Sequence, residues 1–138
     1  MFALQTRYLS FFFGLISILS FFNIIYSYYL NLYLNLDTYY GSFLISFFVS
    51  IIFYKIKTTQ KKLSIFDKIL TVFLGYLLLP IVLSIPFYFS IYNLTFINSY
   101  FESISGFTST GFTIFENIKL IDQSLILWRS STQWIGGL

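Results

Sequence analysis

The sequence predicts an all-α integral membrane protein, in which two transmembrane helices precede one helix–re-entrant loop–helix repeat. Hydrophobic residues make up 57% of the 138 residues and charged residues only 9%, whereas a soluble domain carries about 25% charged residues. The apolar residues gather in three long segments separated by polar turns. A stretch rich in Thr, Ser and Gly, without a helical pattern, then lies between the third segment and a further apolar run.

The composition also excludes several functions. The chain contains no Cys and no His, which removes disulfides, thiol nucleophiles, imidazole bases and the common zinc and copper sites. No run of Lys and Arg with interleaved aromatic residues indicates binding to nucleic acid. We therefore expect no enzyme activity, no cofactor and no nucleic-acid partner, with the lipid bilayer as the main surrounding of the chain.

The first 57 residues are expected to form two transmembrane helices, at residues 9–30 and 38–54. About 20 helical residues cross a hydrocarbon core of ~30 Å, so the second helix is short. The first apolar segment is too long for a typical signal-peptide core, and no small-residue cleavage site follows it. We therefore expect a retained membrane helix.

Residues 58–68 are predicted to be a basic cytoplasmic loop, followed by a third helix at 69–91 that contains Pro80 and Pro86. With a cytoplasmic N-terminus, six of the eight basic residues lie inside: Arg7, Lys55, Lys57, Lys61, Lys62 and Lys68. This orientation satisfies the positive-inside rule. It places the region after the third helix toward the outside.

A short half-helix is expected at 99–106, because Ser99 and Glu102 have the spacing of a capping box and Gly106 suits a helix end. In this interpretation it dips inward, and its C-terminal end carries about half a negative charge toward the membrane centre. Glu102 could instead bias the outer mouth toward cations.

Residues Thr108, Ser109, Thr110, Gly111 and Phe112 follow the half-helix, and we call them the candidate filter segment. Irregular backbone at membrane depth is tolerated only where protein buries it or water lines it. Backbone carbonyls there can replace the hydration shell of a cation, and a glycine permits conformations that a Cβ forbids. The alternative is an ordinary turn.

The last helix is expected at 122–138, with Asp122 as its cap. Arg129 lies within its apolar run and is a candidate intramembrane charge. It could pair with Glu102 or Glu116, or take a direct part in transport.

Residues 101–113 resemble the first pore loop of the TrkH/KtrB (Trk/Ktr/HKT) potassium-uptake family, and residues 127–137 resemble the helix that follows it there. The resemblance implies four helix–pore-loop–helix repeats around one pore, preceded by two extra helices in the TrkH branch. Residues 69–138 would then be the first pore repeat. The resemblance places Ser109 and Thr110 at potassium-coordinating positions and makes Gly111 the filter glycine. Family loops often have Thr where this chain has Ser109.

The expected function is potassium uptake across the cytoplasmic (inner) membrane, with this chain supplying about one quarter of a pore whose selectivity filter is built from carbonyls. The resemblance also implies the remaining repeats, a homodimer partner and a cytosolic nucleotide-binding regulatory subunit as partners. Because the sequence ends inside the last helix, we expect a fragment or a truncated product. The alternative function is a truncated or accessory helical membrane module with a structural or assembly role and no conduction of its own.

Overall fold

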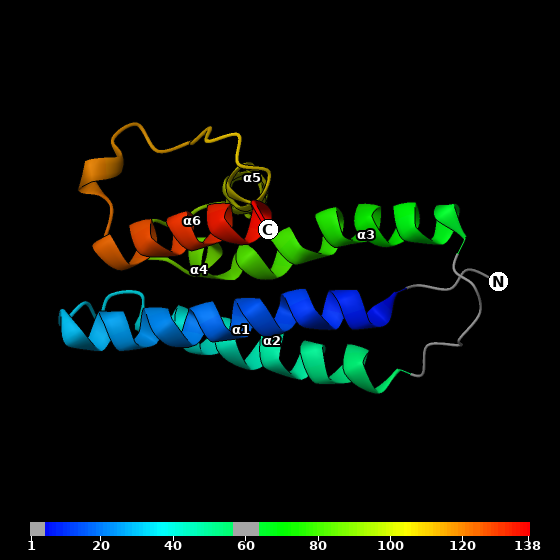
Figure 1. Cartoon of the computed structure of the whole chain (residues 1–138). Coiled ribbons are helices and arrows are strands. Elements are labelled where there is room, and N and C mark those ends of the chain that lie inside the picture. Colours follow the sequence, from blue (N-terminus) through cyan, green and yellow to red (C-terminus); the bar gives the residue numbers. More distant parts are fainter. Residues whose placement is uncertain (1–4, 57–63) are drawn as a thin grey trace.

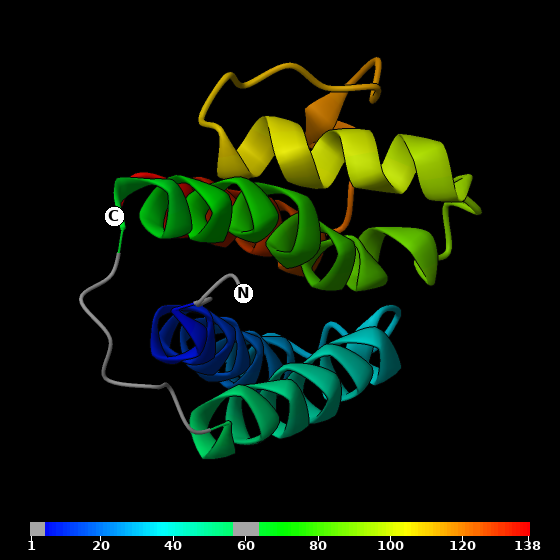
Figure 2. The ribbon, with the colours of Figure 1, turned by 90° about the vertical axis from the view of Figure 1, so that its right-hand side faces the viewer.

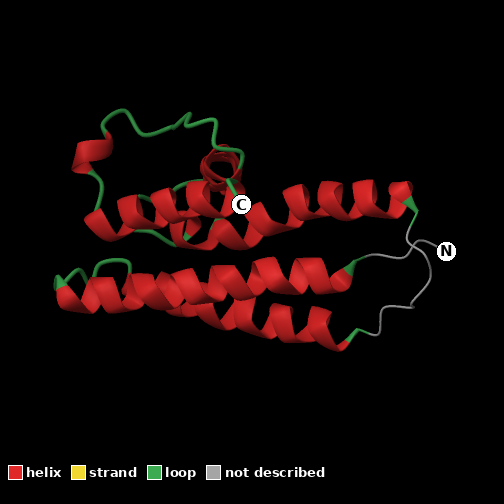
Figure 3. Cartoon of the chain, in the orientation of Figure 1, coloured by secondary structure: helices red, strands yellow, loops and turns green. Residues whose placement is uncertain are grey.

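The computed structural model describes residues 5–56 and 64–138. Every regular element in this described part of the chain is a helix (Figure 3). The helices are α1 (Thr6–Tyr29), α2 (Leu36–Lys55), α3 (Ile65–Leu83), α4 (Ile85–Tyr88), α5 (Phe96–Phe107), the 3₁₀ turn η1 (Ile118–Leu120) and α6 (Gln123–Gly136). The predicted all-α class is therefore confirmed.

Three helical stretches are long and apolar enough to cross a membrane: Thr6–Tyr29, Leu36–Lys55 and Ile65–Tyr88. Large apolar side chains such as Phe11, Ile52 and Phe73 stand more than half exposed on them, as expected for helices whose solvent is lipid. The chain is thus a multi-pass membrane protein.

Helices α1 and α2 form an antiparallel hairpin that packs through small polar residues (Figure 1). Ser10 Oγ donates to the carbonyl of Ser50, and Ser50 Oγ donates to the carbonyl of Ser10, both at 2.8 Å. Ser20 and Ser46 are also fully buried. Small side chains allow close approach of membrane helices, and their hydroxyls add hydrogen bonds in a medium without water.

The third spanning stretch differs from the expected helix at 69–91. It begins at Ile65, where Ser64 and Asp67 form a capping box, so Lys68 lies in the helix and the predicted loop at 58–68 is too long. Residues 57–63, with Lys57, Lys61 and Lys62, lie outside the described residues. The stretch is interrupted between α3 and α4, because Pro86 has no N–H to continue the helical ladder.

Helix α5 crosses the long helices instead of running beside them. Figure 1 looks along its axis, while the long helices lie lengthwise there; Figure 2 shows α5 lengthwise. The expected inward dip is thus replaced by a crossing at about half the length of the bundle. The C-terminal end of α5 still lies about midway along α3, since the ring of Phe107 is 5.1 Å from that of Tyr76.

Helix α6 packs against α5 and α1. Its 14 residues span about 21 Å at ~1.5 Å per residue. Trp128 is fully buried, and its indole N–H donates to the carbonyl of Leu83 at 3.0 Å. The bond falls at the interruption between α3 and α4, so α6 supplies a hydrogen bond where the helical ladder stops.

Candidate ion-conduction site

Helix α5 begins one turn earlier than the sequence predicts, and the assigned capping box at Ser99 and Glu102 is wrong. Thr95 is the N-cap, with its Oγ1 accepting from the backbone N–H of Asn98 at 3.3 Å. Ser99 lies inside the helix and donates to the carbonyl of Thr95 at 3.0 Å. Glu102 faces the protein interior. Thr is a good N-cap, and the helix starts directly after it at Phe96.

The C-terminal end of α5 is closed by the first residues of the candidate filter segment. The N–H of Thr110 donates to the carbonyl of Ser105 at 3.1 Å, and the N–H of Ser109 donates to that of Gly106 at 2.8 Å. Ser109 has φ +57°. This pair of bonds around a left-handed residue is a Schellman motif. The ordinary-turn alternative therefore describes the local backbone correctly, although the turn lies about halfway along the bundle (Figure 1).

The candidate filter segment divides into two halves by the partners of its carbonyls. Within the described part of the chain, no donor reaches the carbonyl oxygens of Thr108, Ser109 or Thr110, and all three residues are exposed. The carbonyls of Gly111 and Phe112 instead accept from Arg129 Nη2, at 3.1 and 3.2 Å. The first half thus presents free oxygens, and the second half is tied to α6.

Two glycines let the ends of α5 and α6 touch. A Cβ on Gly136 would lie 1.6 Å from the carbonyl oxygen of Phe107, and a Cβ on Gly106 would lie 2.1 Å from Thr132 Oγ1. Both distances are far shorter than any real contact. The backbones therefore pack directly against each other, which fixes the start of the candidate filter segment relative to α6.

A buried ion pair lies behind the segment. Glu102 Oε2 is 3.2 Å from Arg129 Nε, with the Glu102 side chain fully buried and that of Arg129 12% exposed. Glu102 Oε1 accepts from the hydroxyl of Thr113 and from the N–H of Ile114, the latter at 2.8 Å. Of the two partners weighed for Arg129 in the sequence, the structure selects Glu102.

Asp122 stands at the N-cap position of α6, but its side chain makes no cap hydrogen bond. Its Oδ2 accepts from Asn35 Nδ2 at 3.0 Å and from the hydroxyl of Ser124. Asn35 also accepts the N–H of Ile91 at 3.2 Å. This polar group joins the α1–α2 hairpin to the start of α6. It was not predicted, since its members are far apart in the sequence.

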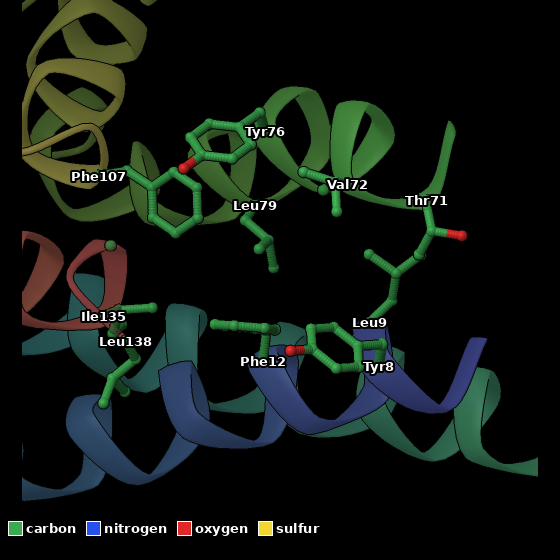
Figure 4. Close-up of a pocket in the computed structure, with 12 residues that line it drawn as sticks. Tyr8, Leu9, Phe12, Thr71, Val72, Tyr76, Leu79, Phe107, Ile135 and Leu138 are labelled. Carbon is green, nitrogen blue, oxygen red and sulfur yellow. The ribbon is translucent and has the colours of Figure 1, made fainter. Parts of the chain in front are cut away.

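Figure 4 shows an apolar cavity of about 150 Å³ among α1, α3 and the ends of α5 and α6. Leu9, Leu79, Phe107 and Ile135 line it with Thr71 and other residues, none of them charged. Such a lining offers few oxygen ligands to a cation. In the described residues no group of three or more Asp, Glu, His or Cys could hold a metal ion.

Comparison with known proteins shows which family the chain is related to. An uncharacterized cation transporter of Methanocaldococcus jannaschii is 31% identical over 110 residues, which are 78% of this chain and 23% of that protein. The Trk system potassium uptake protein TrkG of Escherichia coli is 30% identical over 86 residues, 62% of this chain and 18% of that protein. The chain belongs to the TrkH/KtrB family. TrkI of Halomonas elongata is 42% identical over 60 residues, which cover 44% of this chain and 11% of that protein. No family model matches the chain.

The chain spans less than a quarter of the length of each of these TrkH/KtrB relatives. The names of these relatives describe transport proteins, which agrees with the expectation of a non-enzyme. The structure adds residues that the sequence interpretation missed, namely Thr95, Ser105, Thr113 and Ile114. Only Thr95 had a local signal, a Thr directly before an amphipathic run.

Proposed function

We propose that the protein carrying this chain takes up potassium across the cytoplasmic membrane, and that the candidate filter segment forms one wall of its selectivity filter. The observation that carries the proposal is the row of free carbonyls at the exposed residues Thr108, Ser109 and Thr110, at the end of a short helix that lies about halfway along the bundle. The negative end of the helix dipole favours a cation there, and carbonyl oxygens can replace its hydration shell. The names of the relatives support potassium as the ion.

In this proposal the five residues of the candidate filter segment have different roles, according to the partners of their carbonyls. Ser109 and Thr110 supply carbonyl ligands, together with Thr108. Gly111 turns the chain, with φ +79°, and Phe112 carries it back toward α6. The Ser at 109 keeps the carbonyl ligand that a Thr would supply.

The test uses the full-length protein in a bacterial strain that lacks its own potassium uptake. We expect the wild-type protein to restore growth at low potassium and rubidium uptake. Gly111→Ala should lower the potassium-over-sodium selectivity about tenfold, because a left-handed conformation costs a residue with a Cβ about 1–2 kcal/mol.

Gly41→Ala is the matched control. A Cβ would meet no atom within 4 Å at either glycine, but only Gly111 has a positive φ. Gly41→Ala should therefore keep the wild-type flux ratio. Lack of uptake by the wild type would contradict potassium transport, and an unchanged ratio in Gly111→Ala would contradict the assignment of the filter.

A second candidate function is an accessory helical membrane module with a structural or assembly role. The Schellman motif favours it, because a helix cap alone explains the conformation of Ser109. The same uptake assay separates the two functions, since an accessory module would leave the potassium-to-sodium flux ratio unchanged in Gly111→Ala.

A further inference from the structure

We propose that Arg129, held by Glu102, is a positioning residue that sets the backbone of the second half of the candidate filter segment. This proposal rests on the proposed function, because it concerns how the carbonyls that face the ion are oriented. The ion pair does more than join α5 to α6, since both of its side chains also bind the backbone of the chain that returns from α5.

Arg129 and Glu102 together bind four consecutive residues, 111–114. The guanidinium of Arg129 donates to the carbonyls of Gly111 and Phe112 at 3.1 and 3.2 Å. The carboxylate of Glu102 accepts from the Thr113 hydroxyl and from the Ile114 N–H. Four adjoining residues of the returning chain are therefore tied to one ion pair.

The hydroxyl of Ser105 also binds the carbonyl of Phe112. Ser105 Oγ donates to the carbonyl of Phe112 at 2.6 Å, so this carbonyl accepts from α5 and from α6 together. A planar guanidinium presents its donors in a fixed fork. It therefore defines the direction of the two carbonyls more closely than an ammonium group would.

The charges favour persistence of this arrangement. Glu102 is fully buried and Arg129 nearly so, and a buried charge that loses its partner is strongly destabilising. Each side chain thus holds the other in place. The pair carries no net charge, so a cation near Thr108 to Thr110 meets a neutralised guanidinium.

The geometry also assigns the direction of the carbonyls. The carbonyl oxygens of Gly111 and Phe112 point to Arg129. Those of Thr108, Ser109 and Thr110 have no protein donor in the described residues. Releasing the second half would let the chain rotate about Gly111 and change the oxygens that the first half presents.

The experiment compares variants of the full-length protein in the rubidium-uptake assay with competing sodium. Arg129→Lys keeps a positive charge opposite Glu102 but loses the fork. Loss of a hydrogen bond to a charged group corresponds to about tenfold, so we expect potassium-over-sodium selectivity to fall by about that factor. Lys119→Met, which removes an exposed charge from η1, is the control and should keep the wild-type ratio.

The double variant Glu102→Gln with Arg129→Met separates positioning from folding. Removing both charges should restore the amount of folded protein relative to Arg129→Met alone, but it should not restore selectivity. Hydrogen exchange of the Ile114 amide, whose N–H donates to Glu102, gives a readout in purified protein that does not depend on transport. We expect it to be about tenfold faster in both Arg129→Lys and the double variant, because local opening follows the loss of the bonds.

Wild-type selectivity with unchanged exchange in Arg129→Lys or in the double variant would overturn the proposal. Failure of both variants to fold would assign the pair to folding and would overturn it too. Failure of the proposed function has a different result, since the wild type itself would then take up no rubidium while the exchange difference remained.

Discussion

Single residues at the end of α5 carry the conformations that the candidate filter segment needs. Ser109 adopts φ +57° and Gly111 adopts φ +79°, while Thr110 between them has a negative φ. Glycine adopts such a conformation without steric cost. At Ser109 the Schellman motif requires the left-handed conformation, so a residue with a small side chain bears the strain there.

This geometry predicts different outcomes for two substitutions at Ser109. Ser109→Gly should keep the rubidium uptake, because glycine adopts the left-handed conformation easily and the carbonyl remains. Ser109→Val should lower the yield of folded protein, since a β-branched side chain is a genuine outlier there and costs about 1–3 kcal/mol.

The yield of monodisperse protein in detergent and the rubidium flux measure this difference. Ser130→Val is the control, because Ser130 is an exposed position on α6 where valine costs about 0.7 kcal/mol or less in helix propensity. Equal yields of Ser109→Gly and Ser109→Val would show that position 109 does not keep its left-handed conformation in the membrane.

Between elements, the contact of α5 with α6 decides where the candidate filter segment begins. At Gly136 the two helices touch backbone to backbone, so no side chain can adjust there and the backbone itself defines their spacing. Thr132 fills the space beside Gly106, and its hydroxyl bonds to the carbonyl of Arg129 at 2.7 Å. The contact thus lies one helical turn from the ion pair.

Gly136→Ala should therefore be severely destabilising. The new methyl group would lie 1.6 Å from the Phe107 oxygen, and overpacking costs about 1–3 kcal/mol or more. Gly137→Ala is the matched control, because its methyl group would lie 3.6 Å from the nearest atoms. We expect the thermal unfolding midpoint in detergent to fall by several degrees for Gly136→Ala and to stay unchanged for Gly137→Ala. Equal midpoints would contradict the direct backbone contact.

Across the whole molecule, the sequence predicted the spanning helices well because length and hydropathy are local properties. The three apolar segments fold as α1, α2 and the α3–α4 stretch. The direction of α5 could not be predicted, since a capping signal and an apolar pattern report a helix but not its angle to other helices. The interruption after Leu83 had only the two prolines as a signal.

The partners of the polar side chains were harder to predict. Glu102 matched a local capping pattern, yet its partners Arg129 and Ile114 lie 27 and 12 residues away along the chain. Burial favours the ion pair with Arg129 over a capping bond, because an unpaired carboxylate inside the bundle is costly. Local sequence patterns do not report this cost, so the partner of Glu102 is determined by tertiary contacts.

The orientation of the whole chain is the prediction that remains at this scale. The end of α2 and the start of α3 lie at one end of the bundle, with Lys55 and Lys68, and the turn before α2 lies at the other end (Figure 1). The positive-inside rule places the lysine end in the cytoplasm.

Because this chain has no Cys, single introduced cysteines report directly on which side of the membrane a position lies. In right-side-out vesicles an impermeant maleimide should label Leu34→Cys, an exposed position, and should label Lys55→Cys only after permeabilisation. Inside-out vesicles should give the reverse pattern and serve as the control. Labelling of Lys55→Cys in intact right-side-out vesicles would show that the N-terminus lies outside, and the free carbonyls of Thr108 to Thr110 would then have to be reached from the opposite side of the membrane.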